Sequence, residues 1–404
     1  MAARRREREG PLVVIGPSAS VMGVGFVCSE YPAFRPSHGG IGSVVQTLAR
    51  ALVDRGHRAT VYGFNSRKSE SVEQGVRLVT IPRTGVWSSL RAMRRQLSRD
   101  MAAGLVDVVE SSESEALTLP GGRGSVVRLH GSHHFWCATL PQPRRYRRLL
   151  LEQVAIRRVS GLCAVSQFAA DVTRASMHLG ERPIDVLPNP VDTTTFAPRP
   201  ESVVPGRVVF AGSIMRKKGV HELCLSMAHL LQRHPSAELR VIGRDVPGVD
   251  GDLRETILRD LAPSVRSHVH FLGALPRHEV SREMAAAHVC ALPSHMETQG
   301  LVFVEAMACG RPVVAPGRGP GPEVVGVNDE CGLLVDPSDP RDIAAKIGRV
   351  LDDPALAERL GLHGRQRALE QFSVSTCLVQ NLEFYGRQRH VSTANGRLAA
   401  QRAL

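Results

Sequence analysis

Residues 288–316 read HVCALPSHMETQGLVFVEAMACGRPVVAP. The two ends are short β-rich runs, whereas residues 301–309 between them are apolar and are followed by a glycine, which favours a helix with a glycine stop. A strand, a helix and a strand in direct succession are typical of a parallel sheet with helices packed on its faces. Two glutamates, Glu297 and Glu305, stand in this apolar stretch, where a buried carboxylate is costly unless it is paired.

The same alternation of β-rich and helical segments extends over most of the chain. Residues 187–207 interrupt it, because they hold five prolines and show no clear period, and we interpret them as a linker between two domains. The last segment, 365–388, has the pattern of one helix. The expected strands lie before the linker at 24–29, 59–64, 76–81, 106–110, 125–129, 161–166 and 184–187, and after it at 207–212, 238–243, 268–273, 288–293, 311–316 and 332–337.

A chain of 404 residues is too long for one compact core. We therefore predict an α/β protein with two Rossmann-like, doubly wound domains. We place a ligand in the cleft between them, because such sheets bind ligands outside the carboxyl ends of their strands. The expected boundaries are a disordered or dispensable extension at 1–21, an N-terminal domain at 22–200, a C-terminal domain at 201–375, and at 376–404 a helix that packs back toward the N-terminal domain, with a frayed tail.

Composition narrows the class of protein. Hydrophobic residues make up 43% and charged residues 22%, which is typical of a globular protein, and no apolar run approaches the roughly 20 residues that span a bilayer. The apolar patch near the start is too short for a secretory signal. The eight cysteines include no C-x-x-C pair, which indicates reduced thiols in a cytoplasmic protein rather than a zinc site or disulfides.

The charge of the chain points to anionic partners. A net charge of +12 favours phosphates, nucleic acid or a membrane surface, although an arginine-rich proteome explains it equally well. Two arginine-rich runs, 91–99 and 143–150, lie in the first domain. They are candidates for contact with an anionic membrane, at its inner face, or with a phosphorylated acceptor, and a solvated face explains them at least as well.

The position of Glu305 suggests a binding site. It falls in the early turns of a helix whose N-terminus faces the predicted cleft, and the free N–H groups at such a terminus attract anions such as a diphosphate. A carboxylate there can also accept two hydrogen bonds from a vicinal diol such as that of ribose. The simpler alternative makes Glu305 a helix cap and Glu297 a solvated loop acid, but the presence of both in a cleft favours a site.

Glu297-x7-Glu305, together with AMACGRPVVA at 306–315, resembles the signature of glycosyltransferase family 4, whose members are retaining, nucleotide-sugar-dependent enzymes of the GT-B fold. The resemblance covers about residues 22–385. Further motifs agree with it in order: CSEYP (28–32), GGIG (39–42), RLHGS (128–132), AVSQFAADV (164–172), VLPNPVDTTTFAP (186–198), FAGSIMRKKGV (210–220), PGPEVV (320–325) and CGLLVDP (331–337).

The resemblance implies a role for each matching residue. Glu305 would bind the ribose hydroxyls, and Glu297 would lie beside the donor sugar, near the hydroxyls remote from the reacting carbon. His130 would reach that sugar from the N-terminal domain, and Lys218 would neutralise the leaving diphosphate. The other implied nucleotide-binding positions are backbone N–H groups and glycines that permit close approach: Gln299, Gly300, Leu301, Gly40, Gly42 and, at the phosphate loop, Ser213.

These roles suit the chemistry of sugar transfer. The bond to the nucleotide breaks to an oxocarbenium-like sugar and a diphosphate with extra negative charge, so the site needs fixed positive potential at the leaving group. Lys218 and a helix N-terminus supply it without a metal or another cofactor. Taken alone, Lys218 would be interpreted as an exposed turn lysine; for His130 the alternative is a satisfied core histidine, which its position at a strand end makes the weaker interpretation. The D-x-D match at residues 250–252 is interpreted as a turn.

Two departures from the family pattern stand out. Ser213 replaces an arginine that many relatives carry after the glycine of the phosphate strand, and Arg216 or Lys217 is a candidate to compensate. Gln299 replaces an aromatic residue, so the choice of sugar is expected to depend on its surroundings.

Three functions remain open from the sequence. The preferred one is a glycosyltransferase with a nucleotide-sugar donor and an unidentified acceptor (glycan, lipid, polyol or secondary metabolite). The second is a nucleotide-sugar 2-epimerase of the same architecture. The third is a non-catalytic nucleotide- or nucleic-acid-binding protein, which the positive charge would favour. We expect no nucleic-acid partner.

Overall fold

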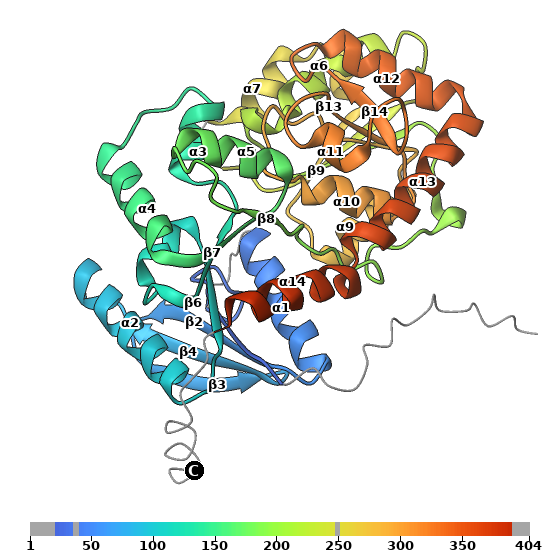
Figure 1. Cartoon of the computed structure of the whole chain (residues 1–404). Helices are drawn as coiled ribbons and strands as arrows, with labels where there is room; N and C mark the ends of the chain where they lie inside the picture. The colour runs from blue at the N-terminus through green and yellow to red at the C-terminus, as the bar shows by residue number, and fades with distance from the viewer. Residues whose placement is uncertain (1–20, 35–39, 247–250, 390–404) are drawn as a thin grey trace, which may run out of the picture.

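The computed structural model describes residues 21–34, 40–246 and 251–389 (Figure 1). The predicted extension and the predicted frayed tail therefore lie almost wholly outside the described residues. The described chain forms two α/β lobes, each built on its own sheet, and the chain passes from the first to the second through the proline-rich segment that the sequence marks as a linker.

The first sheet has eight strands in the order β3-β4-β2-β1-β5-β6-β7-β8. All neighbouring strands are parallel except β3 and β4, which form an antiparallel hairpin. The predicted strands are all present, with ends shifted by a few residues. They are β1 Gly23–Val27, β2 Arg58–Asn65, β4 Val76–Pro82, β5 Val108–Ser112, β6 Gly122–Leu129, β7 Val159–Ala164 and β8 Asp185–Val186.

Strand β3 (Ser69–Glu73) is absent from the strands predicted from the sequence. Every residue of this edge strand is exposed, so it has no apolar alternation to reveal it. It exists because Gln74 and Gly75 both adopt positive φ, 50° and 76°, which is the turn geometry that joins two antiparallel strands closely.

Helices cover both faces of the first sheet. One face packs against α1 (Gly40–Asp54) and α14 (Val374–Gln388). The opposite face packs against α2 (Val86–Ala102), α3 (His133–Thr139), α4 (Tyr146–Arg158) and α5 (Gln167–Ser176), which share one core with it. The short 3-10 helix η1 (Glu113–Thr118) follows β5 and lies under α2 and α4.

The second sheet has six strands, all parallel, in the order β11-β10-β9-β12-β13-β14. These strands are β9 Arg207–Ala211, β10 Glu238–Ile242, β11 Val269–Gly273, β12 Val289–Ala291, β13 Val313–Pro316 and β14 Gly332–Val335. The helices are α6 Val220–Leu230, α7 Leu253–Asp260, α8 Pro263–Arg266, α9 Arg277–Ala286, α10 Leu301–Ala308, α11 Gly321–Val325, α12 Pro340–Asp352 and α13 Pro354–Phe372, with two 3-10 turns, η2 Pro200–Ser202 and η3 Arg216–Lys218. The predicted strand–helix–strand unit is β12–α10–β13.

The prediction of one helix over 365–388 is wrong. Helix α13 ends at Phe372, Ser373 adopts an extended conformation, and α14 begins at Val374. The Ser373 hydroxyl accepts the N–H of Thr376, which caps the new helix. Val191 of the linker pairs with Ser373 in an isolated bridge, so the break falls where the chain returns to the first domain.

A buried polar network fastens α14 to the first sheet. Arg128 of β6 is fully buried, and its guanidinium donates two hydrogen bonds to Glu110 of β5, at 2.8 and 3.0 Å. The same guanidinium contacts Asn381 of α14. The Tyr385 hydroxyl, also from α14, donates to Glu110 at 2.8 Å. Because each partner satisfies the others, the network fixes the helix in one position.

Replacing Glu110 with alanine is expected to lower the free energy of unfolding by about 3–5 kcal/mol, because the substitution leaves the Arg128 charge buried without its carboxylate. Denaturant unfolding measures the change. The matched control is Glu70→Ala, which removes an exposed carboxylate that pairs with Arg77 and is expected to cost about 1 kcal/mol or less. Equal losses for the two variants would contradict the prediction.

Candidate functional site

Loops from the two domains meet where the carboxyl ends of the two sheets face each other. A side chain added at Gly131, after β6, would come within 3.0 Å of the Thr298 side chain, before α10. A side chain added at Gly40, at the start of α1, would come within 4.0 Å of the Leu301 side chain. The predicted site residues lie in or beside these loops.

Lys218 and Glu297 form an ion pair at this junction. The Lys218 ammonium donates to Oε1 of Glu297 at 2.5 Å, and the Ser294 hydroxyl donates to the same oxygen at 3.1 Å. Gly219 allows this approach: its φ is 66°, and an added side chain would come within 1.9 Å of the carbonyl oxygen of Pro293. The turn after β9 therefore lies directly against the loop after β12. Lys218 and Glu297, the two predicted catalytic residues of the second domain, are in direct contact.

Glu305 is paired in this structure with a residue that no sequence motif indicated. It is the fifth residue of α10, and its carboxylate accepts a hydrogen bond from Arg277 of α9 at 3.1 Å. Burial raises the pKa of Glu305, while the nearby Arg277 charge and hydrogen bond oppose that rise. Nothing in the sequence pattern ties position 277 to position 305, because the contact depends on how two helices from different strands lie together.

His130 follows β6 and carries no charge at neutral pH. Burial, with a smaller contribution from the Arg128 charge, lowers the pKa of His130 to about 3. The backbone around it is held by Glu113 of η1, which is buried and accepts the N–H groups of His130 and Gly131 at 3.0 and 2.9 Å. Burial raises the pKa of Glu113 to about 7. Glu113 is a second residue that sequence reasoning missed, since it belongs to no matching motif.

The state of His130 makes stability depend on pH. A histidine whose folded pKa lies below its unfolded value near 6.5 favours the fold above pH 6.5, and this contribution is lost as the pH falls from 6.5 toward 3. Between pH 7.5 and pH 5 we expect the wild type to lose about 1–2 kcal/mol of unfolding free energy that His130→Asn does not lose. The stability of the variant relative to the wild type therefore rises by that amount as the pH falls. Denaturant unfolding at both pH values measures it. A difference between variant and wild type that is the same at both pH values would contradict the prediction.

The side chain of Gln299 is held by the linker between the domains. It is buried, and its amide accepts the N–H of Asn189 at 2.8 Å and donates to the carbonyl of Asn189 at 3.2 Å. The expectation that sugar choice depends on the surroundings of Gln299 stays a prediction, and the role expected of Gln299 itself belongs to its backbone N–H. Next to it, Gly300 adopts φ of 84° and opens α10, and an added side chain would collide with the ring of Phe303.

The loop before α10 is also held from the first domain. The Ser166 hydroxyl caps α5 and donates to the carbonyl oxygen of Thr298 at 2.5 Å. Across the same boundary, the carboxylate of Glu323 from α11 accepts the N–H groups of Gln167 and Phe168, at 2.7 and 3.1 Å, at the start of α5. These bonds hold the loop before α10 and helix α11 against the start of α5 in the first domain.

The remaining predicted positions lie around this centre. Gly40 is exposed and Gly42 is buried within the first turn of α1. Ser213 is half-buried after β9, and the residue after it, Ile214, bridges to Asp245 after β10. Of the two candidates to replace the missing arginine, Lys217 has its ammonium over the ring of Trp136, 4.6 Å from its centroid, and so it is directed toward the first domain.

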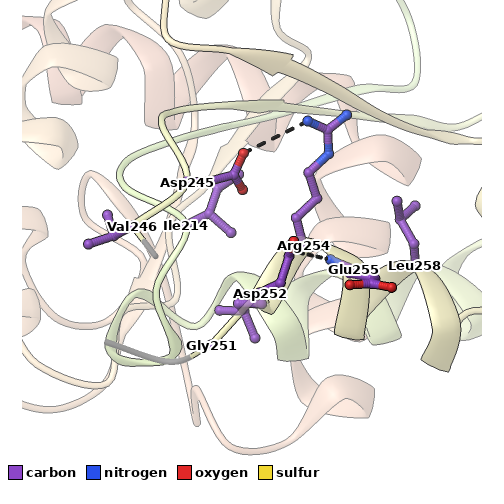
Figure 2. A pocket seen from close by; sticks show the side chains of 9 residues that line it. Ile214, Asp245, Val246, Gly251, Asp252, Arg254, Glu255 and Leu258 are labelled. Carbon is purple, nitrogen blue, oxygen red and sulfur yellow. Dashed lines mark hydrogen bonds and ion pairs between the residues drawn. The ribbon is translucent and has the colours of Figure 1, made fainter. Parts of the chain in front are cut away.

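A pocket of about 470 Å³ opens beside Ser213, at the carboxyl ends of β9 and β10 (Figure 2). Arg254 and Asp245 approach each other across it, with 3.8 Å between guanidinium and carboxylate. The Asp252 carboxylate accepts the N–H of Glu255 at 2.9 Å and caps α7, whereas Asp250 lies outside the described residues. Neither Lys218 nor Glu297 lines this pocket. Its lining is Ile214, Asp245, Val246, Gly251, Asp252, Leu253, Arg254, Glu255 and Leu258.

Two kinds of feature are absent from the described part of the chain. Over 21–34, 40–246 and 251–389, no three histidine, cysteine, aspartate or glutamate side chains lie close enough together to hold a metal ion. Over the same ranges, no helix has both the length and the apolar character that a bilayer crossing requires.

Known proteins resemble this chain over almost its whole length. A family model described as "Glycosyltransferase Family 4" matches residues 38–195, and one described as "Glycosyl transferases group 1" matches residues 194–367. The MMP α-(1→4)-mannosyltransferase of Mycolicibacterium hassiacum is 27% identical, over 86% of this chain and 94% of its own. A GDP-mannose-dependent α-(1-6)-phosphatidylinositol monomannoside mannosyltransferase of Mycolicibacterium smegmatis is 28% identical, over 85% of this chain and 94% of its own.

Solved structures share the fold. Sucrose-phosphate synthase from Thermosynechococcus elongatus superposes with a TM-score of 0.76 at 21% identity, covering 91% of this chain and 98% of its own. The Anabaena protein HepE, solved with UDP and glucose, gives 0.70 at 20% identity, covering 91% and 100%. Both Mycolicibacterium relatives are named as mannosyltransferases, which favours transfer over the epimerase and the non-catalytic alternatives. The chain therefore belongs to glycosyltransferase family 4, adopts the GT-B fold and is a glycosyltransferase.

Proposed function

We propose that the protein moves a sugar from a nucleoside-diphosphate donor to an acceptor hydroxyl with retention of the anomeric configuration. The observation that carries the proposal is the Lys218–Glu297 ion pair at the junction of the two domains. A lysine held there places positive charge where a diphosphate would leave. The name of the Mycolicibacterium smegmatis relative, which specifies GDP-mannose, and the UDP bound to the HepE structure support a nucleotide-sugar donor.

Each side chain has a distinct task in the proposed reaction. The bond from the anomeric carbon to the diphosphate breaks, its electron pair stays with the diphosphate, and Lys218 stabilises that charge. The acceptor oxygen forms the new bond to the anomeric carbon, and its proton passes to an oxygen of the leaving diphosphate. Glu297 orients the sugar and Lys218 together, and Glu305 binds the ribose hydroxyls. His130, which is neutral, exchanges hydrogen bonds with the sugar without carrying charge.

The test has two steps. A thermal-shift screen with UDP, GDP, ADP and TDP first identifies the nucleotide, because a ligand at 100 times its Kd stabilises the fold by about 2.7 kcal/mol. The corresponding nucleotide sugars are then incubated with a panel of acceptors, and the linkage of the product is assigned by NMR. An α-linked product from an α-linked donor is expected. A β-linked product would contradict retention, and release of an epimerised nucleotide sugar without acceptor would contradict transfer.

Chelation provides a second prediction. Because Lys218 supplies positive charge at the leaving group, we propose that the reaction needs no metal ion, and EDTA is expected to leave the initial rate unchanged. The control is the same assay with excess MgCl₂ added back. A rate that falls in EDTA and recovers with the metal would show that an ion, rather than Lys218 alone, stabilises the leaving diphosphate.

A cytoplasmic location at the inner face of an anionic membrane is also part of the proposal. It is supported by the arginine content of α2 and α4, and by the phosphatidylinositol monomannoside in the name of the Mycolicibacterium smegmatis relative. The acceptor would then be presented at the membrane surface. Nucleic acid is not expected to bind, and any binding that survives physiological salt would argue against this.

A further inference from the structure

The outer face of α4 exposes apolar side chains in a row. Tyr146, Leu150 and Val154 are spaced four residues apart, so they lie along one side of the helix, and 74%, 61% and 44% of their surfaces are exposed. Leu151 beside them is also exposed. A helix in a water-exposed surface normally turns such residues inward, as α4 does with Ile156. The exposed row therefore indicates a surface that contacts an apolar partner.

Helices α2 and α4 are rich in arginine, and neither carries an exposed acid. Helix α2 contains four arginines and α4 contains four, which makes eight on the two helices. Their only acidic residues are Asp100 and Glu152, and both are buried and hydrogen-bonded within the domain. The outer face is therefore cationic as well as apolar.

The two helices lie on one side of the first domain, and each of them contacts η1. They pack on the same face of the first sheet and share one core. Burial and the charge of Arg158 on α4 lower the pKa of Arg94 on α2, so the two helices lie within electrostatic reach. Figure 1 shows both on the outer side of the first domain, away from the second domain.

This surface also reaches the edge of the domain where the site lies. Helix α2 begins just after β4 ends, and α4 runs directly into β7, so both helices start at the carboxyl edge of the sheet. Trp87, at the start of α2, is 62% exposed, and Tyr146 stands at the start of α4. An apolar phase that contacts these helices would lie beside the end of the domain that faces the Lys218–Glu297 pair.

We propose that the outer faces of α2 and α4, with Trp87, Tyr146, Leu150 and Val154 as the inserting side chains, form the docking surface for an anionic lipid bilayer. This inference rests on the membrane contact proposed above and assigns it to named residues. Apolar side chains enter the boundary between headgroups and acyl chains while the surrounding arginines pair with anionic headgroups, and binding gains from both contributions.

Charge and shape favour a bilayer over the other occupants. A second copy of the same face would bring two sets of eight arginines together, and this repulsion opposes a symmetric dimer. The phosphates of a nucleic acid could pair with the arginines, but the aliphatic side chains Leu150 and Val154 would have no partner. Proteins that bind nucleic acids do so through phosphate contacts and aromatic stacking on the bases.

Vesicle sedimentation of the full chain tests the proposal. Binding to vesicles of phosphatidylcholine mixed with phosphatidylglycerol is expected, with much weaker binding to phosphatidylcholine alone. Leu150→Ser combined with Val154→Ser is expected to weaken binding about tenfold or more, because two apolar side chains no longer enter the bilayer. Arg147→Gln combined with Arg157→Gln is expected to weaken it and to reduce its dependence on salt.

Matched variants on the second domain serve as controls. Leu362→Ser removes an exposed leucine from α13, and Arg341→Gln removes an exposed arginine from α12. Neither is expected to change vesicle binding. The nucleotide thermal shift is measured for every variant, and it should stay that of the wild type, which shows that each variant is folded with its donor site intact.

The outcomes separate the two proposals. If the wild type ignores anionic vesicles, the membrane contact itself is wrong. If it binds them and the α4 variants bind equally well, the membrane contact stands and its assignment to α2 and α4 is overturned. Sedimentation velocity tests whether a second copy of the chain occupies this face instead of lipid. A wild-type dimer that the Leu150→Ser and Val154→Ser substitutions convert to a monomer would show that it does.

Discussion

Lys218→Ala is expected to lower kcat by about 10²- to 10³-fold while the protein remains folded. The ammonium of Lys218 is fixed by Glu297 in the inter-domain junction, and there its charge is oriented before the donor arrives. Positive charge aimed at a leaving diphosphate stabilises the transition state more than the ground state, because the negative charge grows as the bond breaks. Steady-state kinetics with the donor identified in the nucleotide screen measures the loss.

Two further lysine variants sharpen this result. Lys68→Ala removes an exposed lysine of the first domain and should leave kcat unchanged. Lys218→Arg keeps the charge but changes its shape and reach, so kcat is expected to lie between the wild type and Lys218→Ala. If Lys218→Ala retains the wild-type kcat with an unchanged Tm, Lys218 has no part in the reaction.

Glu297→Ala is expected to reduce kcat by about 10- to 100-fold, which corresponds to one lost hydrogen bond to a charged group. The loss has two sources, since the carboxylate contacts the sugar in the proposed site and also holds the Lys218 ammonium. Glu297→Gln keeps the shape and one acceptor oxygen, and its kcat should fall less.

The effects of the Lys218 and Glu297 substitutions on kcat should not be independent. Because Lys218 and Glu297 are in direct contact, the double variant is expected to lose less activity than the product of the two single losses. Strict additivity of the two losses in free energy would mean that the residues act separately, and it would contradict the role of Glu297 in orienting Lys218. Glu358→Ala, at an exposed position of α13, is the control for a carboxylate outside the site.

Sequence patterns predicted the elements that apolar periodicity determines. The unit β12–α10–β13 was predicted because its strands and helix are buried and lie next to one another in the chain. Strand β3 was not predicted, because it is exposed along its whole length and has no apolar alternation to mark it. Only the turn that joins it to β4 defines it. The helix break at Ser373 was missed because the periodicity on both sides of it is helical and the interruption is a single residue.

The predicted site was limited in a similar way. Motifs placed Lys218 and Glu297 in the same site, but their direct contact spans 79 positions of sequence and follows only from the packing of two strands. Glu113 and Arg277 were missed because each acts on a site residue from a neighbouring element. The contact of the Gln299 side chain with Asn189 was not predicted, because Asn189 comes from the linker between the domains.

The attachment of α14 has a consequence for the order in which the chain is made. The ribosome completes the strands of the first domain long before it reaches residues 374–388, yet Arg128 and Glu110 need Asn381 and Tyr385 from that helix to close their network. During synthesis the Arg128–Glu110 pair of the first domain therefore lacks its partners from α14 until the second domain has been made. The first domain is complete only when α14 packs on its sheet. A premature stop before residue 374 would therefore destabilise the first domain, although that domain is the part of the chain that is made first.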